Sequence, residues 1–126
     1  NISDLREARR FPDVVVHKAQ FVVDIHNPVG GGQANGIAEY VDAYDIPWRS
    51  LVPQKMENLI LAGRCISGTH EAMASYRVMA IAMAIGEAAG IGAALAIDHD
   101  VTPENLDVKY IQKALMDKGA VLFDEK

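Results

Sequence analysis

The sequence predicts an α/β fold, and three segments carry this prediction. An apolar run at residues 58–63 ends in glycine and is typical of a strand buried on both faces of a mostly parallel sheet. The segment at residues 72–97 is rich in alanine, methionine and glycine, which predicts one long helix that is buried on nearly all sides. The closing segment at residues 107–118 has the apolar spacing of an amphipathic helix, with Asp107 as its N-cap and Gly119 after its end.

The first half of the chain predicts shorter elements. Residues 2–12 predict a short helix that a proline ends. Two β-branched or aromatic runs, at 14–16 and 21–23, predict extended segments, for which pairing with each other is the simplest arrangement. Residues 27–36 predict a surface loop because glycine, asparagine and proline are concentrated there, and residues 40–51 predict an irregular or edge strand.

A strand buried on both faces needs neighbouring strands, and this chain supplies few parallel partners for residues 58–63. The chain also begins at Asn1 and not at methionine, which suggests a processed piece or a part of a longer protein. We therefore expect that the rest of the sheet lies in sequence outside the 126 residues given.

Composition excludes several classes of function. The 126 residues carry 12 basic and 17 acidic side chains, a formal charge of −5, which leaves no basic footprint for nucleic acid. The single cysteine, Cys65, cannot form an internal disulfide, and no Cys/His cluster has the spacing of a zinc site, so we expect no metal. The glycines at 30–32 do not make a dinucleotide-binding fingerprint, since the third required position is Asn35. The compartment stays open, with the cytoplasm slightly favoured.

A membrane span is an alternative for the segment at residues 78–97, which is long enough and contains the helix-packing motif Gly86-x-x-x-Gly90. We favour a helix outside the membrane, because alanine and glycine are weakly hydrophobic, Glu87 lies in the middle of the run and no cationic flank follows. The small residues would then let another backbone or a ligand approach the helix closely.

The strongest candidate site is the turn between the apolar run and the long helix. In α/β sheets, ligands bind where strands end and the next helix presents unpaired N–H groups and the positive end of its dipole. Gly63 would let a ligand approach the end of the strand, and Arg64 could bind a phosphate or a carboxylate. A plain strand-to-helix turn with a surface arginine is the other interpretation, and the spacing does not decide between the two.

Other positions carry chemistry as well. Asp24 and His26 are either an acid-base or metal pair, or a structural pair on a strand. His26 and His70 are the candidate acid-base residues, although no catalytic role follows from their spacing. Arg77 enters a nearly apolar helix, so it either pairs with an acid or meets an anionic ligand. Cys65 is expected to be a small buried hydrophobe.

Several motifs together resemble the C-terminal part of a family of bacterial FAD-dependent oxidoreductases, whose dinucleotide-binding fold is like that of glutathione reductase and fumarate reductase flavoprotein subunits. The motifs that carry the resemblance are Arg9-Arg-Phe-Pro-Asp13, Asp24-Ile-His26-Asn-Pro28, Ile46-Pro-Trp-Arg-Ser-Leu-Val-Pro53, Glu57-Asn-Leu-Ile-Leu-Ala-Gly-Arg-Cys-Ile-Ser67, Thr69-His-Glu-Ala72, Arg77-Val-Met79 and Gly86-x-Ala-Ala-Gly90. They cover most of the chain.

The resemblance implies a C-terminal fragment of an FAD-binding, Rossmann-like flavoprotein. Residues 1–45 would end an inserted substrate domain, and residues 46–126 would return to the FAD-binding domain. The N-terminal βαβ unit that holds the ADP half of FAD in such proteins is not in this sequence. The chain alone is therefore expected to be inactive, and its expected partners are the rest of the flavoprotein chain and a small-molecule substrate of unknown identity.

The resemblance also implies where the cofactor lies. Gly63 and Arg64 would lie beside the ribityl and pyrophosphate portion of FAD, and the start of the long helix would point at the N1 and C2 carbonyl edge of the flavin. The residues expected near that edge are Ser75, Tyr76, Arg77 and Val78. From the residues alone, the alternative function is a non-enzymatic packing or oligomerisation module, in which the small-residue helix meets another helix, including that of a second copy.

Overall fold

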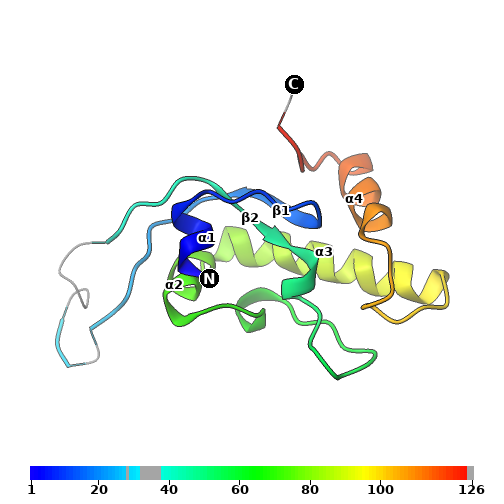
Figure 1. Cartoon of the computed structure of the whole chain (residues 1–126), viewed down its shortest axis with the longest axis horizontal. Coiled ribbons are helices and arrows are strands. Elements are labelled where there is room, and N and C mark those ends of the chain that lie inside the picture. The colour runs from blue at the N-terminus through cyan, green and yellow to red at the C-terminus, as the bar shows by residue number, and fades with distance from the viewer. Residues whose placement is uncertain (28, 32–37, 125–126) are drawn as a thin grey trace.

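The computed structural model describes residues 1–27, 29–31 and 38–124. The elements in chain order are α1 (Ile2–Arg6), β1 (Val14–Ala19), β2 (Tyr44–Pro47), the 3-10 turns η1 (Trp48–Ser50) and η2 (Gly63–Cys65), α2 (His70–Tyr76), α3 (Met79–Asp98) and α4 (Val108–Asp117). Helix α3 runs along the long axis of the molecule, with the two strands above it and α4 near its C-terminal end (Figure 1). It packs against β1, η2 and α4, so it is the central element of the fold.

The sheet of the described residues has two antiparallel strands, β1 and β2. Their register pairs Val16 with Ile46 and Ala19 with Tyr44, with an irregularity between these pairs where Lys18 has a φ of +53°. The extended segment predicted at 14–16 is thus confirmed, but its partner is β2 and not residues 21–23. All four residues of β2 are buried, so β2 gives β1 a buried neighbour. A tight hairpin through residues 17–20 would have paired β1 with residues 21–23 instead.

Residues 58–62 do not form the predicted buried strand: they are irregular, and Asn58, Leu59 and Ala62 are exposed. Leu61 N donates to Leu51 O at 2.7 Å, which is a loop contact and not part of a ladder. The described residues provide no strands beside this segment, and a sheet that continues outside them stays a prediction. A parallel sheet is therefore absent from the described residues, and the fold is compatible with the α/β class only in its mixture of helices and strands.

The long helix predicted over 72–97 is two helices, α2 and α3, separated at Arg77 and Val78. Val78 is extended, with φ −74° and ψ 154°. Arg77 Nη2 donates to Asp24 O at 3.0 Å, so a tertiary contact holds the chain where the helix breaks. Local helix propensity is a weak preference, and tertiary contacts such as this one override it.

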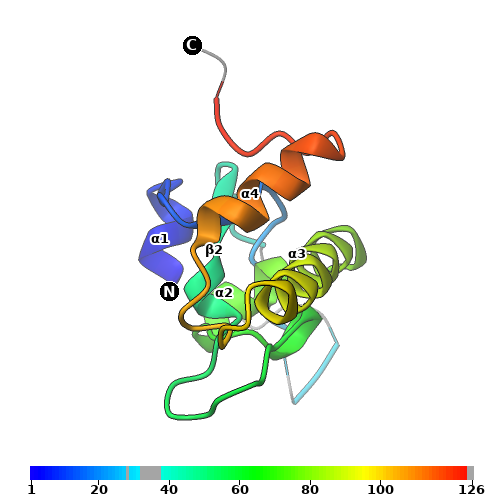
Figure 2. The same cartoon turned by 90° about the vertical axis from the view of Figure 1, so that its right-hand side faces the viewer.

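Helix α3 is buried on one face and not on nearly all sides. Its buried residues are Ile81, Ile85, Ala88, Ala89, Gly92 and Ala96. Its exposed residues at helical spacing are Met79, Met83, Gly86, Gly90, Ala93 and Ile97, which we call the bare stripe. Figure 2 shows α3 at the outer side of the molecule. The prediction of a helix buried all round was wrong because it assumed neighbours that the described residues do not supply.

Trp48 joins β2 to α3. Its side chain is 5% exposed, and its Nε1 donates to Pro103 O at 3.2 Å. A Cβ added to Gly92 would lie 2.8 Å from Trp48 Cζ3, so only glycine allows the indole to lie this close to the helix. A close approach does occur at Gly92, but the approaching group is an indole side chain of the same chain, whereas the prediction named another backbone or a ligand.

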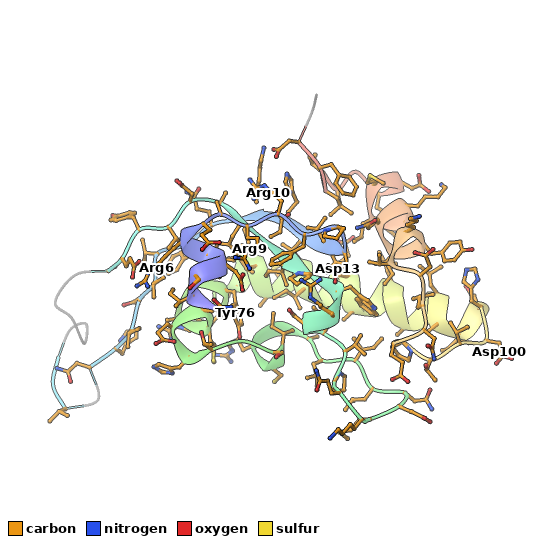
Figure 3. All side chains as sticks on the ribbon, in the orientation of Figure 1. Arg6, Arg9, Arg10, Asp13, Tyr76 and Asp100 are labelled. Carbon is orange, nitrogen blue, oxygen red and sulfur yellow. The ribbon has the colours of Figure 1, made fainter. Side chains whose placement is uncertain are left out.

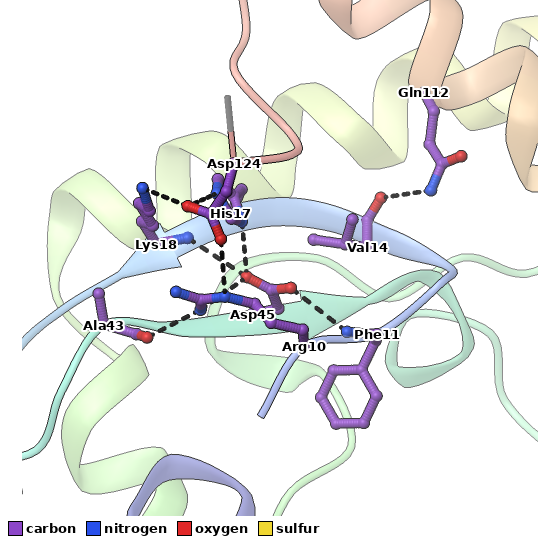
Figure 4. Close-up of polar contacts among 9 residues, drawn as sticks. All are labelled: Arg10, Phe11, Val14, His17, Lys18, Ala43, Asp45, Gln112 and Asp124. Atoms are coloured by element: carbon purple, nitrogen blue, oxygen red, sulfur yellow. Dashed lines mark hydrogen bonds and ion pairs between the residues drawn. The ribbon is translucent and has the colours of Figure 1, made fainter. Parts of the chain in front are cut away.

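A buried carboxylate, that of Asp45, connects the two strands to the N-terminal segment (Figure 4). Its side chain is 2% exposed. Its donors are Arg10 Nη1 at 3.2 Å, Phe11 N at 3.3 Å, His17 Nδ1 at 2.8 Å and Lys18 N at 3.4 Å. A buried carboxylate that takes donors from both the N-terminal segment and β1 stabilises one register of the chain, because another register would leave it with fewer donors.

The structure confirms a helix at each end of the chain, with one correction. Helix α1 ends at Arg6, well before Pro12, so the prediction that a proline ends it was wrong; its start is capped by Asn1, whose side chain accepts from Ser3 N. Helix α4 is capped by Asp107, whose side chain accepts from Lys109 N, and Gly119 follows its end with a φ of +96°. Part of the loop predicted at 27–36 lies outside the described residues.

Two further predictions bear on the architecture. Strand β2 crosses the boundary predicted between residues 45 and 46, and the division into 1–45 and 46–126 stays a prediction. Helix α3 is long and apolar enough to cross a membrane by length and composition, and 33% of an apolar 18-residue stretch within it is buried in the fold. One such helix is weak evidence, since the core helix of a globular protein passes the same test.

Substitution of Gly92 and of Gly90 should have opposite effects on stability. Gly92→Ala places a methyl group against Trp48, so we expect the free energy of unfolding to fall by about 1–3 kcal/mol. Gly90→Ala is the matched control, because nothing lies within 4 Å of its added Cβ. It should raise stability by up to ~1 kcal/mol through helix propensity. Urea denaturation of both variants tests this, and equal shifts in one direction would refute the Trp48 contact.

Candidate functional site

The turn at Gly63 is open to an approaching ligand. Gly63 has a φ of +60°, a backbone conformation that favours glycine, and an added Cβ would meet nothing within 4 Å. Arg64 and Cys65 follow it in η2 and are both exposed. The expectation that Cys65 is buried was therefore wrong, since η2 turns its side chain away from the core. The predicted turn is present, although no strand leads into it.

Ser75 and Tyr76 direct their side chains into the chain's own core. Ser75 Oγ donates to Phe21 O at 2.6 Å and lies 2.8 Å from the hydroxyl of Tyr44. Tyr76, labelled in Figure 3, is buried and its hydroxyl donates to Ile66 O at 3.4 Å. These side chains hold α2 against the strands and the 63–68 turn. Contact of these two residues with a flavin stays a prediction.

Burial also changes the acidity of two tyrosines. Burial raises the pKa of Tyr44 to about 12, and the hydrogen bond with Ser75 only partly offsets it. Burial likewise raises the pKa of Tyr76. Both hydroxyls are therefore neutral hydrogen-bonding groups, and neither is arranged as a proton donor for chemistry near neutral pH.

Arg77 lies at the corner between α2 and α3 and is partly exposed. Its Nη2 donates to Asp24 O at 3.0 Å and lies 3.5 Å from Asp24 Oδ2. Of the two outcomes predicted for this cation, pairing with an acid is confirmed. The guanidinium has five N–H donors, so the pairing with Asp24 leaves donors for a ligand as well.

Helix α3 begins at Met79, and its N-cap residue, Val78, follows Arg77 and makes no side-chain cap hydrogen bond. The first N–H groups of a helix have no partner within the helix, and they carry the positive end of its dipole. Met79 and Ala80 of this first turn are exposed. An uncapped helix start beside a cation is suited to a negatively charged or electron-rich group, which is what the flavin edge becomes on reduction.

The two candidate histidines share one cleft. Its volume is about 200 Å³, and its lining residues are Asp24, Ile25, His26, His70, Met73, Ala74 and Arg77. Asp24 and His26, which are close in sequence, are in direct contact, with His26 Nε2 3.1 Å from Asp24 Oδ2. The structure thus brings Asp24, His26, His70 and Arg77 together, while Gly63 and Arg64 lie on the separate turn η2, which packs against α3.

Two residues that fix the framework of the fold were not predicted from the sequence. Asp45 is an acid between the apolar residues Tyr44 and Ile46, and a charge in such a strand must be paired, so the alternation could have revealed it. Trp48 gave no comparable signal, because its partner Gly92 is far away in the sequence. Within the described residues, no group of three or more His, Cys, Asp or Glu side chains could hold a metal ion.

The helices and the two-stranded sheet of the described residues are compatible with an α/β protein. A family model for FAD dependent oxidoreductases matches residues 1–115, and the chain therefore belongs to this family. The family implies FAD as the cofactor of the full-length protein, which agrees with the resemblance drawn from the motifs. No curated protein and no solved structure matches the chain.

Deprotonation of Tyr44 should destabilise the fold at high pH. The pKa of Tyr44 is about 12 in the folded protein, against the ordinary value of 10 in the unfolded chain. The stability that the neutral hydroxyl contributes is therefore fully present below pH 10 and is lost as the pH rises toward 12. The free energy of unfolding should fall by roughly 2–3 kcal/mol over this range. Urea denaturation of wild type and Tyr44→Phe at several pH values measures the effect, and Tyr110→Phe, at a half-exposed tyrosine, is the control. A wild-type decline no steeper than that of Tyr44→Phe would contradict it.

Proposed function

We propose that this chain supplies the part of an FAD-dependent oxidoreductase that holds the ribityl chain and the isoalloxazine ring. The observation that carries the proposal is the start of α3, which no side chain caps and which only the N-cap residue Val78 separates from Arg77. Family membership supplies the cofactor, and the uncapped helix start offers an electrostatic match to it. FAD provides the hydride chemistry, while the residues of this chain bind the cofactor and tune it.

The electrostatics of this arrangement favour the reduced flavin. Reduced flavin carries negative charge at N1 and at the C2 carbonyl, and a helix N-terminus stabilises nearby negative charge. Arg77 adds a positive charge next to this end of α3, which the carboxylate of Asp24 at 3.5 Å partly offsets. In the proposed arrangement these two features raise the reduction potential of the flavin, and Ser75, Tyr76 and Val78 contribute through backbone groups near that corner.

Gly63 and Arg64 fit the ribityl and pyrophosphate portion in the proposal. The open space beside Gly63 lets a ligand approach the backbone, and the exposed Arg64 is available to an anionic group. Arginine binds phosphate oxygens with two parallel hydrogen bonds, which suits a pyrophosphate. We assign no other role to this turn.

The finer fold in the proposal is a Rossmann-like one, as in glutathione reductase and fumarate reductase flavoprotein subunits. The rest of the flavoprotein chain would supply the ADP-binding unit and the strands beside residues 58–62. Two observations support this partner: that apolar segment has no neighbouring strand in the described residues, and the bare stripe of α3 is exposed. In this arrangement residues 1–45 belong to the substrate domain, and catalysis requires the complete protein.

The bare stripe also supports a second candidate, a packing or oligomerisation module without enzymatic activity. Met79, Met83 and Ile97 are 83%, 74% and 80% exposed, which is unusual for large apolar residues on one helix. Gly86 and Gly90 between them leave room for a second helix. Sedimentation analysis distinguishes the candidates, because a mass that rises with concentration in a protein without affinity for flavin would favour the module.

Flavin retention tests the proposed function. In the complete flavoprotein, purified without added flavin, we expect Gly63→Val to abolish the visible flavin band, since the side chain fills the ligand's approach. Valine also strains a residue whose φ is +60°, so Gly63→Asn is the sharper variant. Asparagine tolerates this conformation but still adds bulk.

Gly119→Asn is the matched control, because Gly119 also has a positive φ but lies after α4. We expect it to keep the flavin band while Gly63→Asn loses most of it. A normal band in Gly63→Asn would remove this turn from the flavin site. A wild-type protein that is folded, colourless and unable to take up added FAD would refute the proposed function itself.

A further inference from the structure

The cleft at the corner of α2 and α3 gathers the candidate acid-base residues of the chain. One wall is the extended segment 24–26 and the other is α2, so residues far apart in the sequence meet there. Its volume of about 200 Å³ is that of six or seven water molecules in the liquid, at ~30 Å³ each. The cleft is therefore large enough for a small polar molecule or for one end of a larger one.

Asp24 is fixed in this cleft from two directions. Its N–H donates to Ala74 O at 3.4 Å, and its carbonyl accepts from Arg77 Nη2 at 3.0 Å. Arg77 Nη2 is also 3.5 Å from the carboxylate oxygen Oδ2. Because the backbone and the side chain of Asp24 are both tied to the same corner, its carboxylate has a defined position.

That carboxylate orients His26. The ring nitrogen Nε2 lies 3.1 Å from Asp24 Oδ2, which favours the proton on Nε2. The other nitrogen, Nδ1, then carries the lone pair and can accept a proton. His26 is 69% exposed, so this nitrogen can reach a ligand, and the pair has the arrangement of a base held by a carboxylate.

We propose that the Asp24–His26 pair is the proton acceptor in the oxidation of a small CH–OH compound by the flavin. This inference rests on the proposed function, since FAD is the acceptor of the hydride. The hydroxyl O–H bond breaks and its proton passes to His26 Nδ1, while a C=O bond forms. The C–H bond breaks at the same carbon, and its hydrogen leaves with both electrons to oxidised FAD. Substrate is oxidised by two electrons and FAD is reduced by two, so atoms and charge balance.

The position of the cleft supports this chemistry. Arg77 lines the cleft and also immediately precedes the start of α3, where the proposed function has the flavin edge. The groups that face His26 are the carboxylate of Asp24, the guanidinium of Arg77 and the imidazole of His70. His70 lies on the α2 wall and is exposed, so it can bind a further hydroxyl of the substrate. We assign it substrate binding and not proton transfer.

The test uses the complete flavoprotein with its bound flavin, mixed without oxygen with glycerol, glucose and lactate as CH–OH probes. Loss of the flavin absorbance measures reduction, and the absorbance before mixing measures flavin retention. We expect at least one probe to reduce the wild type. His26→Gln should keep its flavin but slow reduction by about 100-fold or more. It should also lose the fall in rate at low pH, which reports protonation of the base.

Three companion variants separate the roles. Asp24→Asn should slow reduction by about 10-fold or more, since the base loses its orientation. His70→Gln should raise the KM while the kcat stays unchanged. His99→Gln is the matched control, because His99 is exposed but stacks on Tyr110, with ring centroids 4.3 Å apart. It should behave as wild type.

A measurement without turnover completes the design. With histidine labelled by ¹⁵N, the Nδ1 of His26 should show the chemical shift of an unprotonated nitrogen at mildly alkaline pH. A protonated Nδ1 would overturn the proposal, as would wild-type rates with an unchanged pH profile in His26→Gln, loss of flavin in that variant, or a flavin that none of the probes reduces. A wild type that holds no flavin would count against the proposed function instead.

Discussion

The contact between Trp48 and Gly92 is the constraint on which the rest of the fold depends. It fixes the end of β2 against the middle of the buried face of α3, and the indole N–H bond to Pro103 adds the loop after that helix. Burial of a tryptophan removes about 150–250 Å² from water, which is worth roughly 4–6 kcal/mol. Because the indole requires a glycine opposite it, the register of α3 against the strands has little freedom.

Asp45 extends this constraint to the N-terminal segment. Its carboxylate is enclosed by donors from residues 10–11 and from β1, so β1 and β2 can adopt only the register in which those donors meet it. Gln112 in α4 donates to the carbonyls of Pro12 and Val14, which ties the closing helix to the same strand. With β1, β2, α3 and α4 held in this way, the corner at Arg77 is built on a rigid frame.

The sequence predicted the elements whose signals are local. The cap at Asp107 and the turn glycines Gly63 and Gly119 follow from side-chain and backbone preferences within a few residues, and the structure confirms these features. The sequence did not predict the partner of β1 or the break at Arg77, since both depend on residues far away along the chain. The apolar run at 58–62 was misassigned for a related reason: it predicts burial, and the described residues do not contain what would cover it.

Helix α3 has one face in a defined core and another face with exposed apolar residues. One face is satisfied by Trp48 and the strands, while the bare stripe and the uncapped start remain open to groups from outside the described residues. A helix that is polar on its outer side would need no such partner, and α3 carries only Glu87 there before its last turn. The start of the same helix lies next to Arg77, which holds Asp24 and through it His26. Cofactor binding, domain packing and proton transfer would therefore all depend on the position of one helix, which Gly92 sets.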